Sequence, residues 1–257
     1  MTKHIDNFIV TDSIRLTSKY QLLKLSAPEH ADLAAIAPGQ FVQVKIDNSD
    51  LTFLRRPISI HEVDVTGNTI SLLVCRAGDG TNALCDTPVG STINLMWPLG
   101  NGFSLPDSAN QTVLLVGGGV GVAPLLYLGK TLKDKGFKPE FLLAARTAAD
   151  LLQLDSFAQY GQVYISTDDG SAGEKGLVTE HSTLKVKRNH VFCCGPMPMM
   201  KAIARLCRAN ATDCQVSLEN VMACGIGACL CCVEKTVKGN RCVCTDGPVF
   251  YINELTW

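Results

Sequence analysis

The sequence predicts a multi-domain protein of the α/β and β classes, with an antiparallel β-barrel, a parallel-sheet α/β domain and a small cysteine-rich C-terminal domain. Three observations support this prediction. The first hundred residues alternate short β-rich runs with turn residues, the middle of the chain alternates apolar runs with helical stretches, and six of the twelve cysteines fall within residues 224–244. We place the domain boundaries at residues 1–107, 108–213 and 214–257.

The composition excludes several classes of protein. Hydrophobic residues make up 46% of the 257 residues and charged residues 18%, so charge repulsion does not keep the chain unfolded. Twenty-three basic residues against 24 acidic ones give a net charge of −1, which argues against a nucleic-acid-binding protein. The longest uncharged stretch, residues 108–129, contains five glycines and Pro124. It therefore predicts a strand and a turn rather than a membrane span.

The N-terminus and the cysteines together predict a cytoplasmic protein. The first eight residues contain no apolar core of signal-peptide length. A chain without a secretory signal stays in a reducing compartment, where disulfides are rare. Cysteines that are crowded together in such a protein are better explained as metal or redox ligands.

Short β-rich runs fill the first part of the chain. Clear examples are Gln40–Ile46, Pro57–Ile60 and Thr69–Cys75. Turn residues flank these runs at Pro38-Gly39 and Gly67-Asn68. Closely spaced strands separated by such turns are typical of a small antiparallel barrel.

The pattern changes after residue 107. An apolar run at Thr112–Val116 leads through a glycine turn into a helix-like stretch that ends near Lys135, and Met199–Asn210 also has a helical pattern. Further apolar runs follow at Phe141–Ala145, Gln162–Ile165 and Val191–Cys194. Strands that alternate with helices predict βαβ units on a parallel sheet.

Two segments of the barrel predict a flavin site. In the first, two arginines precede Pro57-Ile58-Ser59. A guanidinium can pair with a pyrophosphate, and a serine hydroxyl can reach a ring nitrogen. The second segment, Arg76–Thr81, carries two glycines just before a short helix expected at Asn82–Cys85, and N–H groups at a helix start favour an anion. Each segment alone is also explained as an ordinary strand edge or turn, and Cys75 as a small packing residue.

A Rossmann-like nucleotide site is predicted by the turn that follows the first apolar run of the middle domain. Gly118, Gly119 and Gly121 allow the close backbone approach that a dinucleotide pyrophosphate needs. Pro124 follows in the first helical turn, where its missing N–H would have no partner anyway. The later turn at Cys194-Gly195 is expected to form a further edge of this pocket.

The nucleotide preference stays open at this point. The acidic residue that such sites carry about 20 residues after the glycines is absent. Arg146 occupies that region instead, and its guanidinium suits a 2′-phosphate, so both NAD and NADP are compatible with the pattern. The segment Thr167–Gly170 is interpreted as a polar turn.

The spacing of the C-terminal cysteines predicts an iron–sulfur cluster. Cys224-x4-Cys229-x2-Cys232-x11-Cys244 matches the plant-type ligation of a [2Fe–2S] cluster by four thiolates. Two glycines inside the x4 loop allow the backbone to curl and to direct N–H groups at cluster sulfides. Zinc bound by four cysteines is the alternative, although zinc ribbons favour C-x2-C pairs at both ends.

In this order along the chain, the motifs resemble the ferredoxin–NADP reductase superfamily, and within it the family of bacterial dihydroorotate dehydrogenase B electron-transfer subunits. The stretches that carry the resemblance are Leu54–Ile60, Pro98–Phe103, Val116–Val122, Thr167–Ser171, Cys194–Pro196, Met222–Cys229 and Asp246–Phe250. The last two are the most diagnostic. The chain departs from the family pattern at Trp97, where glycine is usual, and in its two additional cysteines, Cys231 and Cys242, which we interpret as spectators. Cys242 is two residues from Cys244 and is the alternative fourth ligand; we favour Cys244 because it directly precedes Thr245-Asp246-Gly247-Pro248.

The resemblance implies a partner and an electron path. In the family, a separate FMN-containing catalytic subunit oxidises dihydroorotate to orotate, a step of pyrimidine biosynthesis, and two of each subunit form a heterotetramer. Electrons pass through [2Fe–2S] to FAD and leave as hydride to NAD⁺. By position, the FAD contacts would be Arg56, Pro57, Ile58, Ser59, Val74, Cys75, Arg76, Gly80 and Thr81, and the cluster ligands would be Cys224, Cys229, Cys232 and Cys244.

The residues support the same chemistry without the resemblance. A nicotinamide exchanges two electrons as hydride, an iron–sulfur cluster passes one at a time, and a flavin does both. The sequence contains neither a recognisable Ser/His/Asp pattern nor H-E-x-x-H, so no catalytic residue is predicted on this chain. Two alternatives are an NAD(P)H-dependent flavin and iron–sulfur reductase component serving an oxygenase or hydrogenase-type complex, and a zinc-stapled binding module.

Overall fold

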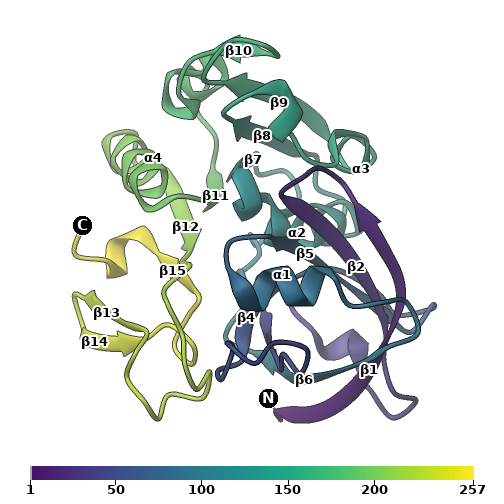
Figure 1. Ribbon diagram of the computed structural model, residues 1–257. Coiled ribbons are helices and arrows are strands. Elements are labelled where there is room, and N and C mark those ends of the chain that lie inside the picture. The colour runs from purple at the N-terminus through teal and green to yellow at the C-terminus, as the bar shows by residue number, and fades with distance from the viewer. Residues whose placement is uncertain (1) are drawn as a thin grey trace.

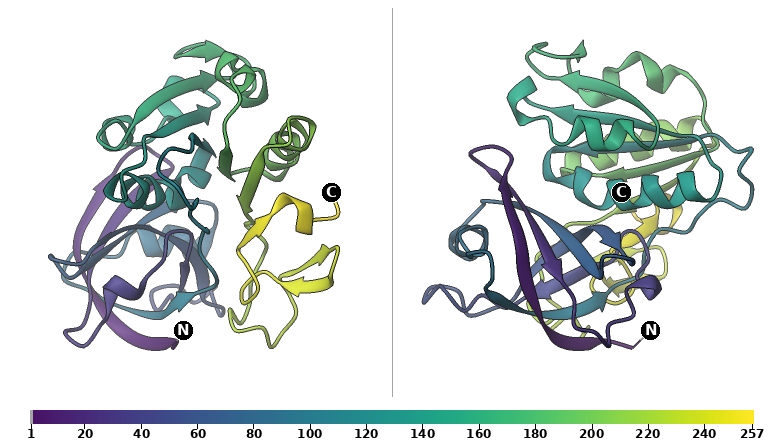
Figure 2. Two further views of the ribbon diagram at one scale, coloured as in Figure 1. Left: turned by 180° about the vertical axis from the view of Figure 1, so that it is seen from behind. Right: turned by 90° about the vertical axis from the view of Figure 1, so that its right-hand side faces the viewer.

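The computed structural model describes residues 2–257, and Met1 lies outside the described residues. A barrel from the N-terminal part, a parallel sheet from the middle and a C-terminal segment form three adjoining bodies (Figure 1). Figure 2 shows the C-terminal segment beside the barrel and next to α4. None of the helices in the described part of the chain is long and apolar enough to cross a membrane.

Six antiparallel strands close the barrel in the order β1-β2-β5-β4-β3-β6, which confirms the predicted architecture. The strands are β1 His4–Arg15, β2 Tyr20–Ser26, β3 Phe41–Val44, β4 Arg56–Asp64, β5 Thr69–Cys75 and β6 Thr92–Leu99. The helix α1, Asp79–Cys85, begins three residues earlier than expected, because the helical turn already includes Gly80. Alternation on β3 turns Val42 and Val44 into the barrel core, while Phe41 faces the rest of the molecule.

The second body is a seven-stranded sheet in the order β10-β9-β8-β7-β11-β12-β15. Its strands are β7 Val113–Gly118, β8 Pro139–Ala145, β9 Gln162–Thr167, β10 Glu174–Lys175, β11 His190–Cys194, β12 Asp213–Ser217 and β15 Val249–Tyr251. All neighbours pair in parallel except β15, which is antiparallel to β12. The α-helices are α2 Ala123–Asp134, α3 Leu154–Ala158 and α4 Met197–Ala209. Pro124 lies in the first turn of α2, as the sequence predicts.

The C-terminal segment is built from loops and a small hairpin of β13, Val233–Thr236, and β14, Gly239–Cys242. Short 3₁₀ turns across the chain are Leu33–Ala35, Gly119–Val122, Ala148–Asp150, Val178–Glu180, Ser182–Lys185 and Ile252–Glu254. One continuous core joins all three bodies. It contains Phe41 from the barrel, Val116 from the sheet, and Cys232 and Cys244 from the cysteine-rich segment. Because β15 also extends the sheet, the segment is held to the other bodies by both packing and strand pairing.

Candidate functional sites in two adjoining cavities and a cysteine loop

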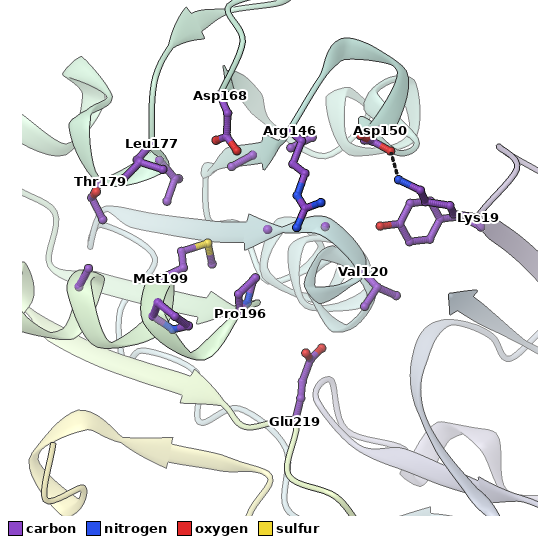
Figure 3. A pocket seen from close by; sticks show the side chains of 18 residues that line it. Lys19, Val120, Arg146, Asp150, Asp168, Leu177, Thr179, Pro196, Met199 and Glu219 are labelled. Atoms are coloured by element: carbon purple, nitrogen blue, oxygen red, sulfur yellow. Dashed lines mark hydrogen bonds and ion pairs between the residues drawn. The ribbon is translucent and has the colours of Figure 1, made fainter. Parts of the chain in front are cut away.

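The larger cavity, of about 540 Å³, opens at the carboxyl ends of the parallel strands (Figure 3). Ligands of open α/β sheets bind at this edge. Gly118 and Gly119 line the cavity from one side, and Pro196 and Met199 line it from the other. Two of the glycines predicted to bind nucleotide therefore face a cavity, and Cys194-Gly195 lies directly before Pro196.

Close packing explains why both turns that border this cavity contain glycine. A Cβ atom added to Gly121 would lie 2.5 Å from the Cα atom of Gly195, and one added to Gly118 would lie 2.6 Å from the Sδ atom of Met199. Real Cβ contacts of this kind are longer by about an ångström. Gly121 therefore does not line the cavity, but its lack of a side chain allows the two turns to meet.

Charged side chains surround the far end of this cavity. Arg146 and Asp168 both extend towards it from the strand ends (Figure 3). Lys19 and Asp150 form an ion pair at 3.4 Å on the same rim. Asp168 places a carboxylate at this edge of the sheet, where such a group can accept a hydrogen bond from a ribose hydroxyl. The sequence could not identify it, because it follows the next strand of the sheet and looks like part of a polar turn.

The smaller cavity, of about 240 Å³, lies between the barrel and the sheet. Five residues of the predicted flavin site line it, namely Pro57, Ile58, Ser59, Cys75 and Thr81. Cys75, which the sequence also explained as a packing residue, thus borders a cavity. The opposite wall comes from the sheet and the C-terminal segment. These residues are far from the barrel residues in the sequence, so the sequence alone could not assign them to this cavity.

The other predicted flavin residues lie next to this cavity but do not line it. Arg56 is beside α1, because a Cβ atom on Gly80 would lie 2.8 Å from its Nε atom. Arg76 is paired with Asp86 at 2.7 Å. The side chain of Val74 is fully buried in the barrel core, so only its main chain is available for a flavin contact.

Glu219 is a further site residue that sequence reasoning missed. Together with Val120 it lines both cavities, and its carboxylate extends towards the larger one (Figure 3). Burial raises the pKa of the Glu219 carboxyl, and an opposing effect comes from the Sγ atom of Cys194, which donates to its Oε1 atom at 3.9 Å. The available signal was a lone acid two residues after the buried strand β12.

Three of the four predicted cluster cysteines, Cys224, Cys232 and Cys244, accept backbone hydrogen bonds at sulfur. The amides of Ile226 and Cys229 each donate to the Sγ atom of Cys224 at 3.4 Å. The amide of Gly227 donates to Cys244 Sγ at 3.2 Å. Burial acts to raise the pKa of the Cys224 thiol, but the amides of Ile226 and Cys229 lower it, and the resulting pKa is about 6. Amides directed at sulfur are the arrangement that an anionic iron–sulfur centre requires.

The arrangement of the thiols fits two irons better than one zinc ion. The thiols of Cys224 and Cys229 contact one another, and so do those of Cys232 and Cys244. In a [2Fe–2S] centre with four thiolate ligands, each tetrahedral iron takes two of them and shares the sulfides. Zinc needs four ligands around a single ion.

The two thiol pairs differ in burial. Cys229 is exposed and Cys224 is partly exposed, whereas Cys232 and Cys244 are buried. The buried pair shares its core with Phe41 and Met222, which also line the smaller cavity. The cysteine loop therefore has one side at the molecular surface and the other against the wall of the smaller cavity, which we call the flavin-type cavity because predicted flavin residues line it. Of the two additional cysteines, Cys231 points elsewhere, because its Sγ atom donates to the carbonyl of Val221 at 3.6 Å.

Two protein-family models match this chain. Residues 219–256 match the iron–sulfur cluster binding domain of dihydroorotate dehydrogenase B, and residues 115–205 match the oxidoreductase NAD-binding domain. Among solved structures, the NADH-dependent reduced ferredoxin–NADP oxidoreductase is similar with a TM-score of 0.86 and 29% identity, covering 97% of this chain and 90% of that one. The ferredoxin reductase of carbazole 1,9a-dioxygenase has a TM-score of 0.70 at 19% identity, covering 82% of this chain and 67% of that one, and shows the fold alone.

Curated relatives are more similar in sequence than either structure. The dihydroorotate dehydrogenase B (NAD(+)) electron transfer subunit of Fusobacterium nucleatum is 42% identical over 85% of this chain and 86% of the relative. The subunit of the same name from Shouchella clausii is 40% identical over 85% of this chain and 86% of the relative. The cysteine loop, the glycine turn and these relatives agree, and the chain belongs to the family of dihydroorotate dehydrogenase B (NAD(+)) electron transfer subunits.

Proposed function

We propose that this chain takes electrons from dihydroorotate oxidation on a partner subunit and passes them through a [2Fe–2S] cluster and FAD to NAD⁺, in pyrimidine biosynthesis. One observation carries the proposal. The flavin-type cavity shares Val120 and Glu219 with the nucleotide cavity, and it shares the core around Phe41 and Met222 with the buried cysteine pair. A flavin bound there lies between the one-electron and the two-electron partner.

In this proposal the barrel residues bind FAD, which supplies the conversion between one-electron and two-electron transfer. The Arg56 guanidinium binds the pyrophosphate next to Gly80 at the start of α1. Pro57 and Ile58 pack against the ring system, and the Ser59 hydroxyl hydrogen-bonds to a ring heteroatom. The remaining contacts predicted by position come from the segment Val74–Arg76 and from Thr81, whose hydroxyl also accepts from the amide of Ala77 at 2.9 Å.

The glycine turn binds the nicotinamide dinucleotide. Gly118 and Gly119 let the pyrophosphate approach the backbone at the start of α2, and Gly121 and Gly195 keep the two turns in contact. Glu219 places a carboxyl group between the two cavities, and burial raises the pKa of that group because it disfavours the charged form. Cys194 orients that carboxyl through its thiol.

Cys224, Cys229, Cys232 and Cys244 are the proposed cluster ligands. The pairing of their thiols gives each iron two thiolates. The choice of Cys244 over Cys242 as the fourth ligand is supported by its burial and by its amide, which donates to Cys232 Sγ at 3.4 Å. All twelve cysteines are free thiols, which fits the cytoplasmic location that we also propose.

The partner subunit is proposed to dock at the exposed side of the cysteine loop. Val221 and Leu230 on that loop are 78% and 63% exposed, and Phe53 on the loop before β4 is 94% exposed. Both loops contact Gln43. Gly225 of the cysteine loop packs on the Gln43 side chain, and Arg55 of the loop before β4 donates to the main-chain carbonyl of Gln43 at 3.1 Å. Apolar side chains gathered on a surface mark protein contacts. We propose the FMN-containing catalytic subunit as the occupant, in a heterotetramer with two copies of each subunit.

Co-purification tests this function. The chain is expressed with its native partners, and iron, acid-labile sulfide, FAD and FMN are measured together with NAD⁺ reduction by dihydroorotate. We expect two irons per chain, FAD on this chain and FMN on the partner. A complex without FMN that does not oxidise dihydroorotate refutes this assignment and favours a reductase component of an oxygenase or hydrogenase-type complex. A colourless protein with zinc favours the binding module.

A further inference from the structure

Gln43 is a fully buried polar side chain without a partner. Its exposed fraction is 0%, and neither Nε2 nor Oε1 has a hydrogen-bond partner among residues 2–257. A buried amide that loses its bonds to water and makes none in the protein is destabilising. Such a group in a well-packed molecule usually has a ligand or another bound group as its missing partner.

The position of Gln43 identifies the group that it faces. On β3 it points in the same direction as Phe41, out of the barrel and towards the C-terminal segment. A Cβ atom on Gly225 would lie 2.8 Å from Cγ of Gln43 and 3.1 Å from its Nε2 atom. Gly225 is the residue after Cys224, and its φ of +69° curls the loop around the proposed cluster. The unpartnered amide is therefore in contact with the loop that supplies two of the four ligands.

A second buried glutamine shows that the barrel does not leave such amides unbonded as a rule. Gln21 faces the barrel interior on β2, and its Nε2 atom donates to the hydroxyl of Ser13 at 2.8 Å. Only its Oε1 atom lacks a partner. Gln43 differs because its donor group is free as well, and the cysteine thiolates and sulfides of an iron–sulfur centre are acceptors without donors.

We propose that Gln43 donates a hydrogen bond from its carboxamide to a sulfur atom of the [2Fe–2S] centre bound by the Cys224–Cys229 loop, and thereby raises the reduction potential of the centre. The inference rests on the proposed function, because it requires the cluster. Hydrogen bonds to sulfur stabilise the additional negative charge of the reduced state, so each donor shifts the potential upwards. The other amide donors belong to the cysteine segment itself, as with Ile226, Gly227 and Cys229.

Gln43 differs from these amides because it belongs to the barrel. On the neighbouring strand β4, the residue paired with Gln43 is Pro57 of the proposed flavin site. The main-chain carbonyl of Gln43 accepts a hydrogen bond from Arg55. The same residue thus contacts the strand that lines the flavin-type cavity and the loop that binds the cluster. Gln43 is a positioning and tuning residue that couples the potential of the cluster to the docking of the C-terminal segment on the barrel.

The test compares Gln43→Met with Gln21→Met in the holoprotein. Methionine keeps the shape of glutamine and removes its donors. Iron and acid-labile sulfide are counted, and the midpoint potential of the cluster is measured by a redox titration followed by electron paramagnetic resonance. We expect Gln43→Met to lower the potential and to shift the g-values, while Gln21→Met leaves both at the wild-type values. Gln43→Leu serves as a second variant and is expected to behave like Gln43→Met.

Each outcome decides the inference. Loss of iron from both Gln43 variants, with FAD retained and iron kept in Gln21→Met, supports the contact as well, since the cluster then depends on the amide. Wild-type potential and g-values in both Gln43 variants overturn the inference and leave the proposed function intact. A wild-type protein that binds no iron at all refutes the proposed function instead.

Discussion

Replacing Gly121 by alanine adds a methyl group where two turns meet. The new Cβ atom would lie 2.5 Å from both the Cα and N atoms of Gly195. Carbon atoms in contact stay about 3.5–4.0 Å apart, so the turns must separate by roughly 1 Å. Overpacking of this kind costs about 1–3 kcal/mol of stability. A misplacement of about 1 Å at a reacting centre costs about 10²-fold in rate. We expect kcat/KM for NADH to fall by about that factor.

The assay is the reduction of ferricyanide by NADH, which requires the nucleotide and flavin sites but not the partner subunit. The matched control is Gly136→Ala. Gly136 has a φ of +85°, so alanine is strained there by about 1 kcal/mol, but the nearest atom to the new methyl group is 3.9 Å away and outside both cavities. We expect the control to lose stability and to keep its NADH kinetics. Equal NADH kinetics in the two variants, with the same FAD content, would refute the steric argument.

Three further predictions concern buried or charged groups. Burial raises the pKa of the Glu219 carboxyl, so FAD reduction by NADH should slow as the pH rises and this carboxyl loses its proton. In Glu219→Gln, FAD reduction followed by stopped-flow absorbance should be about 10²-fold slower and independent of pH. Burial lowers the pKa of His61, which contacts the carbonyl of Ala123 at 2.8 Å. His61→Leu should cost about 1–3 kcal/mol in urea unfolding at pH 7. Wild type should lose stability as the pH falls below the unfolded value of about 6.5, and the variant should not. Asp168→Ser should raise the NADPH-to-NADH ratio of kcat/KM by roughly tenfold, because it removes one negative charge from the cavity that Arg146 lines; an unchanged ratio would exclude Asp168 from specificity.

Local patterns predicted most of the fold. The strand Thr69–Cys75 has the predicted bounds, and the parallel strands and α2 lie where apolar runs and a glycine turn indicate them. Pairing over long distances was not predictable. The antiparallel strand β15 adds to the sheet at β12, more than thirty residues earlier in the chain, and no periodicity encodes that contact. The predicted domain boundary at residue 214 remains a prediction, although β12 crosses it.

The same distinction holds for the sites. Glycine turns and cysteine spacings are visible in sequence because one backbone segment supplies the whole feature. Glu219 and Gln43 are different, since each acquires its surroundings from another body of the molecule. A lone acid after a strand or a glutamine in a β-run has no distinctive spacing. Their significance depends on burial and on unsatisfied hydrogen bonds, which only the tertiary structure reveals.

The account depends on an electron path that runs through the cysteine loop before it reaches the flavin. Cys229→Ser in the complex with the catalytic subunit tests this path, with Cys231→Ser as the control, because Cys231 is exposed and donates to a carbonyl outside the proposed ligand set. We predict that Cys229→Ser abolishes NAD⁺ reduction by dihydroorotate and keeps ferricyanide reduction by NADH, while Cys231→Ser keeps both. Full dihydroorotate-driven NAD⁺ reduction in Cys229→Ser would contradict the account.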